Sequence, residues 1–131
     1  MGAETVDAGG EDVAGRVRDL TEGAGADVVF ELVGTAATSA TALACLGKGG
    51  ALVYIGYSFD DVPLNPLSLV VAEQRILTSV GNRRSELVKA LDLAASGRLR
   101  THVSTAPLEE AAAVLADLRA GRVVGRAVLV P

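Results

Sequence analysis

Short apolar runs alternate with amphipathic stretches along the chain. The first clear run, residues 28–33, is rich in β-branched and aromatic residues and is followed by glycine, which predicts a strand buried on both faces. Thr35 can cap a helix of small residues reaching about Leu46, and Gly47 can end that helix in a left-handed turn. A second apolar run, residues 52–55, predicts the next strand. The two strands and the helix form a βαβ unit, whose right-handed crossover makes the strands parallel.

The same alternation continues on both sides of this unit. Glu11 and Asp12 fall in the first turn of an expected helix, where the helix dipole favours acidic side chains. Two prolines exclude residues 62–66 from a central strand but leave an edge position open. The other expected elements are a short strand at 3–7, a helical turn or two at 67–72, a strand at 75–80, a helix ending before Gly97, an extended segment at 99–105, a helix from Pro107 to Arg119 and a strand at 123–130.

This order of elements predicts an α/β layer structure formed by a single domain, residues 1–131. A chain of 131 residues is long enough to bury its own core. Half of its residues are apolar but only 3% are aromatic, so Val, Leu, Ala and Ile must fill the core, as in parallel-sheet proteins.

Composition also narrows the partners and the compartment. The net charge of −4, with acidic and basic residues interspersed, disfavours nucleic-acid binding. The longest uncharged run, residues 32–47, is too short and too polar to cross a membrane. Residues 1–20 contain no apolar block typical of a secretory signal, so we expect a cytoplasmic protein. The single cysteine, Cys45, excludes an intrachain disulfide and a cysteine-cluster metal site.

Glycine follows three of the expected strands directly, at Gly34, Gly56 and Gly81. In an open parallel sheet a ligand binds beyond the carboxyl ends of the strands, so Val33, Gly34, Gly56 and Tyr57 are the first residues to consider. Glycine at these ends allows a flat ligand to lie against the backbone. Ordinary strand-to-helix turns explain the same glycines, and the sequence favours neither explanation.

Few side chains carry catalytic potential. His102 fits a surface or packing role better than a catalytic one. Cys45 lies among apolar neighbours with no base beside it in the sequence, as expected of a buried, unreactive thiol. Glu31 interrupts an apolar strand, which indicates a structural acid with a partner or a strand that nears the surface. Arg126 follows Gly125 in the final strand, where it could hold a phosphate or lie in solvent as an edge residue.

Four segments in order carry a resemblance to a known family: GADVVFELVG, LGKGGALVYIGY, LNPLSLVVAEQRILTSVGN and residues 84–131. Their succession resembles the zinc-type alcohol dehydrogenases of the medium-chain dehydrogenase/reductase superfamily over essentially the whole chain. The resemblance implies the carboxyl-terminal part of such an enzyme, a partial Rossmann-like, doubly wound parallel sheet that lacks its first two strands. Residues 1–97 would then form an incomplete dinucleotide-binding domain, and 98–131 a C-terminal segment that returns to the catalytic domain.

The resemblance further implies an NAD(P)-dependent oxidoreductase acting on alcohols and on aldehydes or ketones. It places Arg126 at the cofactor's pyrophosphate. The edge strand at Arg75–Val80, with residues 62–64, would lie at the subunit interface of a homo-oligomer. The segments expected to line the nicotinamide and its ribose are Leu32, Val33, Gly34, Ile55, Gly56, Tyr57, Val80, Gly81 and Asn82.

Several residues that the family uses for binding and catalysis have no counterpart in this sequence. We expect the GxGxxG phosphate loop, the residue that selects NAD or NADP, and the zinc ligands all to lie upstream, so the chain supplies no catalytic residue and no metal ligand. We therefore expect the chain alone to be inactive, and to be a fragment or to self-associate through the exposed flank of strand 28–33. A zinc-independent quinone or enoyl reductase and a non-catalytic binding or dimerisation module remain alternatives.

Overall fold

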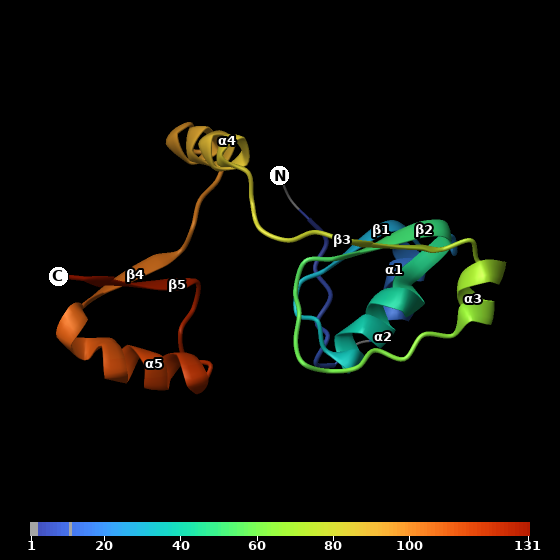
Figure 1. Ribbon diagram of the computed structural model, residues 1–131, viewed down its shortest axis with the longest axis horizontal. Coiled ribbons are helices and arrows are strands. Elements are labelled where there is room, and N and C mark those ends of the chain that lie inside the picture. Colours follow the sequence, from blue (N-terminus) through green and yellow to red (C-terminus); the bar gives the residue numbers. More distant parts are fainter. Residues whose placement is uncertain (1–2, 11) are drawn as a thin grey trace. The chain divides into compact units, whose positions relative to one another are not determined.

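The computed structural model describes residues 3–10 and 12–131, and the chain divides into two compact units (Figure 1). We call residues 1–81 the first unit and residues 82–131 the second unit. Each unit is described by itself below.

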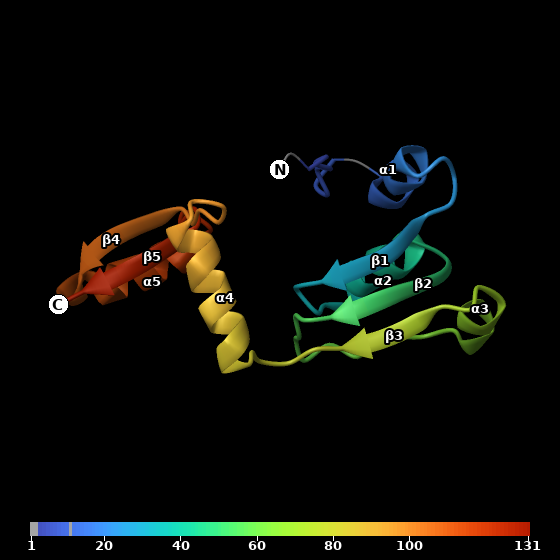
Figure 2. The same ribbon diagram turned by 90° about the horizontal axis from the view of Figure 1, so that it is seen from above.

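The first unit is a parallel three-stranded sheet with helices. Its sheet has the order β1-β2-β3, and each neighbouring pair is parallel, which confirms the predicted βαβ unit. Helix α2 lies behind the sheet in Figure 2 and leaves the opposite face free of helices of this unit. The elements are α1 (Val13–Leu20), β1 (Ala26–Glu31), α2 (Ala36–Cys45), β2 (Leu46–Tyr54), α3 (Pro66–Val71) and β3 (Arg75–Thr78).

A side-chain cap fixes the start of α2, and an extended backbone conformation at Leu46 ends the helix. Thr35 is its N-cap, as predicted, and its side chain accepts a hydrogen bond from the Thr38 N–H. The predicted left-handed turn at Gly47 is wrong. Leu46 is already extended, so the helix passes directly into β2, and the positive φ of 73° belongs to Gly49.

The core of the first unit lies between α2 and one face of the sheet. It consists of Ala42, Leu46 and Leu52, against which Val29, Leu43 and Tyr54 pack. The other face is open, and the exposed fractions are 48% for Val28, 62% for Phe30 and 49% for Leu77. The prediction that the strand at 28–33 is buried on both faces is therefore wrong. β1 is also an edge strand, which agrees with the expected exposed flank.

The amino-terminal segment differs from its prediction. Residues 3–7 form no strand, because no described strand lies beside them to complete a hydrogen-bonded ladder. Asp12 caps α1 by accepting the Gly15 N–H, at 3.1 Å. Glu11, expected in the same turn, lies outside the described residues.

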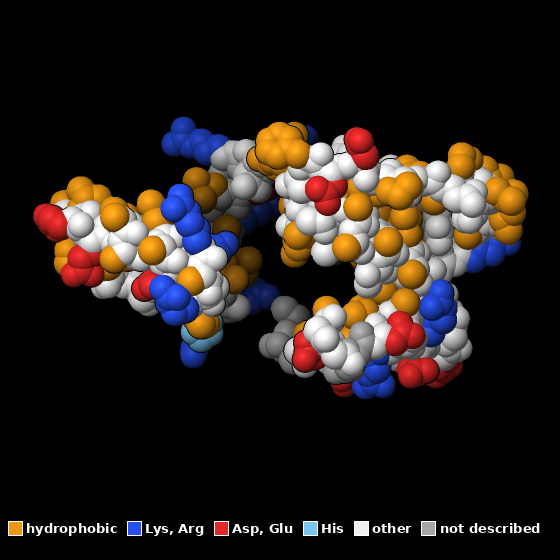
Figure 3. Space-filling view, turned by 90° about the horizontal axis from the view of Figure 1, so that it is seen from below, with side chains coloured by type: hydrophobic (Ala, Val, Ile, Leu, Met, Phe, Trp, Pro, Cys, Tyr) orange, Lys and Arg blue, Asp and Glu red, His pale blue; other side chains and the backbone are white. Residues whose placement is uncertain are grey.

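The second unit contains a parallel pair of strands and two longer helices. α5 contacts β4 and the short helix η1, whereas α4 keeps Leu87 and Leu91 largely exposed. Figure 3 shows apolar side chains at the surface of both units. Within the described ranges 3–10 and 12–131, no helix is long and apolar enough to cross a membrane. The elements are α4 (Arg84–Ala95), β4 (Val103–Pro107), η1 (Leu108–Glu110), α5 (Ala111–Arg119) and β5 (Arg126–Val130), with β4 and β5 parallel.

Candidate cofactor site at the strand ends

The three strands of the first unit end at one edge of the sheet. The carbonyl of Glu31, the last residue of β1, accepts the N–H groups of Ile55 and Gly56 at 2.8 and 2.9 Å. The Ser79 N–H donates to the Tyr54 carbonyl at 2.9 Å, which joins the end of β3 to the end of β2. The turns that carry Gly34, Gly56 and Gly81 therefore leave the sheet at the same edge.

Gly34 and Gly56 are required because the turn after β1 lies directly against the turn after β2. A Cβ on Gly34 would lie 2.3 Å from the Tyr57 Cα, and a Cβ on Gly56 would lie 2.2 Å from the Leu32 carbonyl oxygen. Gly34 also has a φ of 83°, which disfavours any other residue. The contact between the turns accounts for both glycines without a ligand. Gly81 differs, because its Cβ would meet open space and only its φ of 65° favours glycine.

Glu31 sets the shape of the turn after β1. The residue is 4% exposed, and its carboxylate accepts the Val33 N–H at 3.1 Å and the Gly34 N–H. A buried carboxylate with two backbone donors is well satisfied. This confirms the interpretation of Glu31 as a structural acid with a partner, which is the backbone of the following turn.

The residues around these turns present an apolar, accessible rim. Val33, Tyr57 and Val80 are 56%, 85% and 93% exposed, and Leu32 and Ile55 are exposed as well. Apolar side chains beside open backbone can accommodate a flat ring. The structure thus brings together the predicted residues Leu32, Val33, Gly34, Ile55, Gly56, Tyr57, Val80 and Gly81 in the first unit.

Asn82 and Arg126, the other two predicted residues, belong to the second unit. Arg126 is the first residue of β5, and its N–H donates to the His102 carbonyl at 2.9 Å. Its exposed guanidinium donates to the Gly125 carbonyl at 3.2 Å and forms no ion pair with any described residue. A Cβ on Gly125 would lie 2.3 Å from the His102 carbonyl oxygen, so the turn into β5 needs glycine there.

The remaining candidate side chains lack a catalytic arrangement. Cys45 is 5% exposed, and burial raises the pKa of its thiol, with the Arg18 guanidinium opposing and the Asp12 carboxylate adding to this effect. His102 is exposed. In the part of the chain that the structure describes, no group of three or more His, Cys, Asp or Glu side chains could hold a metal ion.

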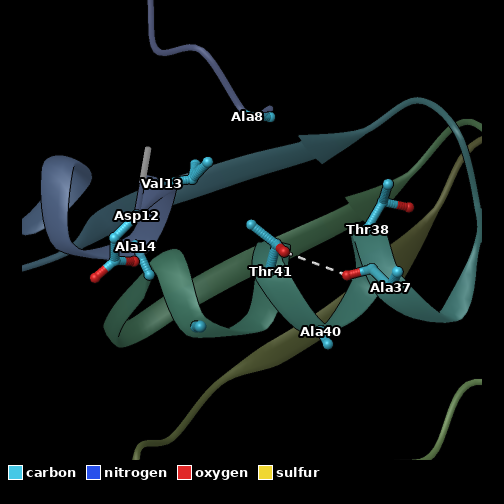
Figure 4. A pocket seen from close by; sticks show the side chains of 9 residues that line it. Ala8, Asp12, Val13, Ala14, Ala37, Thr38, Ala40 and Thr41 are labelled. Carbon is cyan, nitrogen blue, oxygen red and sulfur yellow. Dashed lines mark hydrogen bonds between the residues drawn. The ribbon is translucent and has the colours of Figure 1, made fainter. Parts of the chain in front are cut away.

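A hollow beside α2 offers no alternative chemistry. Figure 4 shows it lined by small side chains of α2, with Asp12 and Val13 of the α1 region and Ala8 on its other sides. The Thr41 hydroxyl donates to the Ala37 carbonyl at 3.2 Å and so already has its partner. The strand ends remain the better candidate.

The segment after β2 contributes two residues that the sequence analysis missed. Ser58 and Asp60 hydrogen-bond to the turn after β1, 24 residues earlier in the chain. Their only sequence signal is a short polar loop directly after a strand, which does not identify the acceptor or donor.

The parallel sheet with its helices places this protein in the Rossmann-like class of α/β folds. Residues 1–129 match the family model for zinc-binding dehydrogenases, and the chain belongs to that family.

Individual relatives agree with this assignment. The chain is 28% identical over 92% of its length to D-arabinose 1-dehydrogenase (NADP(+)) of Saccharolobus solfataricus. It is 29% identical over 96% of its length to an NAD-dependent alcohol dehydrogenase of Sulfurisphaera tokodaii. It covers 35% and 37% of these two proteins, so it spans about a third of their length.

Solved structures show the same fold. The alcohol dehydrogenase of Aeropyrum pernix matches with a TM-score of 0.86 and 33% identity, over 96% of this chain and 36% of that one. A quinone oxidoreductase of Pseudomonas syringae matches with a TM-score of 0.78 and 28% identity, over 98% of this chain and 42% of that one. These comparisons confirm the family resemblance and the α/β fold.

Proposed function

We propose that this chain contributes the nicotinamide-binding surface of an NAD(P)-dependent oxidoreductase that interconverts alcohols and aldehydes or ketones. The observation that carries the proposal is the meeting of three strand ends, with their glycine turns and apolar rim, at one edge of the first unit. Relatives named for NAD and for NADP⁺ support the cofactor class. The chain corresponds to an incomplete dinucleotide-binding domain followed by a C-terminal segment.

In this proposal the residues have distinct roles. The nicotinamide, when bound, supplies the hydride acceptor or donor. Val33 and Tyr57 offer apolar surface to the ring, and Gly81 leaves room beside it. Arg126 has an exposed guanidinium, suited to the pyrophosphate. The other residues proposed to line the site are Leu32, Gly34, Ile55, Gly56, Val80 and Asn82.

Reduced nicotinamide mononucleotide tests the proposed surface directly, because it lacks the adenine half. We expect its addition to shift the backbone amide signals of Gly34, Gly56 and Gly81 in the full 131-residue chain. A Val80→Glu variant should bind about tenfold more weakly, since it places a carboxylate on the rim. Nuclear magnetic resonance titration measures both effects.

Val70→Glu is the matched control for that titration. Val70 is 74% exposed on α3, which precedes β3 and so lies on the amino-terminal side of that strand. This variant should bind like the unchanged chain. Absence of any shift at millimolar probe, or equal loss in both variants, would contradict the proposal.

We also propose that copies of the chain associate through the free edge at Arg75–Val80. β3 ends the sheet on one side, and Leu77 is 49% exposed. We expect concentration-dependent dimers in sedimentation equilibrium and a shift to monomer in Leu77→Lys. Leu67→Lys, at a 70% exposed position on α3, should leave the dimer intact. A monomer at all concentrations would contradict this interface.

A zinc-independent quinone reductase is the second candidate function. The structural match to the Pseudomonas syringae quinone oxidoreductase favours it. The strand-end surface would serve both reactions, so turnover assays of the longer protein with alcohols and with quinones separate them.

A further inference from the structure

The loop after β2 ties down the turn that follows β1. The Ser58 hydroxyl donates to the Gly34 carbonyl at 2.7 Å, and the Asp60 N–H donates to the Ser58 Oγ at 3.0 Å. The Asp60 carboxylate accepts the Ala36 N–H at 3.0 Å. Two polar side chains from one loop thus hold the backbone on either side of Thr35.

Asp60 also brings a charge that α2 lacks. The first turn of α2 contains no acidic residue, and Ala36 is its first residue. A carboxylate at this end interacts favourably with the helix dipole and with the unpaired N–H groups. The interaction joins the start of α2 to a segment that leaves the adjacent strand.

These contacts act on the same backbone as the candidate site. Gly34 approaches the Tyr57 backbone so closely that no Cβ fits between them, and Tyr57 directly precedes Ser58. The Ser58 hydrogen bond to Gly34 therefore lies beside the contact between Gly34 and Tyr57, where the two turns meet. Loss of this bond would remove one of the contacts that hold the two turns together, while the strands stay paired.

We propose that Ser58 and Asp60 are positioning residues that hold the two strand-end turns at the spacing required for nicotinamide. This inference rests on the proposed function of the strand ends. Neither residue contacts the cofactor in this scheme. They act through the backbone of Gly34 and Ala36.

Their position favours positioning over a general role in stability. The Asp60 bond to Ala36 is exposed and the Ser58 bond to Gly34 is partly buried, and the core of the first unit lies elsewhere, between α2 and the sheet. Single hydrogen bonds outside the core contribute modestly to folding. Removal of either side chain should therefore alter the turns more than the unfolding transition.

The test compares Ser58→Ala and Asp60→Ala with Asp61→Ala in the full chain. Asp61 is the exposed neighbouring acid and has no hydrogen bond to any described residue. We expect Ser58→Ala and Asp60→Ala to bind reduced nicotinamide mononucleotide about fivefold more weakly, and Asp61→Ala to bind normally. The Ala36 amide hydrogen should exchange with solvent faster in Asp60→Ala, because it loses its acceptor. A substitution that weakened binding without altering this turn would leave the exchange rate unchanged.

Asp60→Asn keeps an acceptor oxygen without the charge and should retain most of the affinity for reduced nicotinamide mononucleotide. This variant still allows the comparison if Asp60→Ala does not fold. Unchanged affinity and unchanged Ala36 exchange in both alanine variants, while the unchanged chain binds the probe, would overturn the positioning role alone. Failure of the unchanged chain to bind the probe would overturn the proposed function, and this inference with it.

Discussion

Replacing Gly34 by alanine is expected to lower the free energy of unfolding of the first unit by about 3 kcal/mol or more, from steric overlap and backbone strain together. The new Cβ would lie 2.3 Å from the Tyr57 Cα, and the φ of 83° is unfavourable for alanine. Both tyrosines of the chain, Tyr54 and Tyr57, lie in the first unit, so denaturant unfolding followed by tyrosine fluorescence reports on that unit.

Gly23→Ala separates the two causes. Gly23 has a similar φ of 88°, but a Cβ there meets nothing within 4 Å. This control should lose only about 1 kcal/mol, the cost of the left-handed conformation. Equal losses in the two variants would show that the turns after β1 and β2 do not approach each other as described.

Replacing Glu31 by alanine is expected to cost about 2–4 kcal/mol, because it leaves two backbone N–H groups, one buried and one partly buried, without their acceptor. Those groups belong to Val33 and Gly34. The same variant should weaken binding of reduced nicotinamide mononucleotide, since the rim loses its fixed shape. Tyrosine fluorescence and the probe titration measure the two effects.

Asp27→Ala is the control on the same strand. Asp27 is exposed, and its removal should change the free energy of unfolding by no more than about 0.5 kcal/mol. Glu31→Gln, which keeps one acceptor oxygen, should fall between the two. If Glu31→Ala were as stable as Asp27→Ala, the carboxylate would not be holding the turn.

The sequence predicted those parts of the fold that depend on local signals. Thr35 as a cap and the parallel βαβ unit both follow from residues close together in the chain. Predictions that depended on a partner element did less well. Burial of Phe30 and a strand at residues 3–7 both require neighbouring elements that are not found among the described residues of the first unit.

The candidate site shows the same division. Strand ends marked by Gly34, Gly56 and Gly81 were predicted to meet, because parallel strands share an edge. The sequence could not show that a close approach between two turns already explains Gly34 and Gly56. It also could not assign partners to Ser58 and Asp60, since a hydroxyl and a carboxylate in a polar loop have many possible partners.

The unpaired side of β1 has a practical consequence for anyone who works with this chain. A separately produced peptide that supplies one parallel strand is expected to extend the hydrogen-bonded ladder there. The chain is thus a starting point for a split reporter, in which pairing of the peptide with β1 produces the signal.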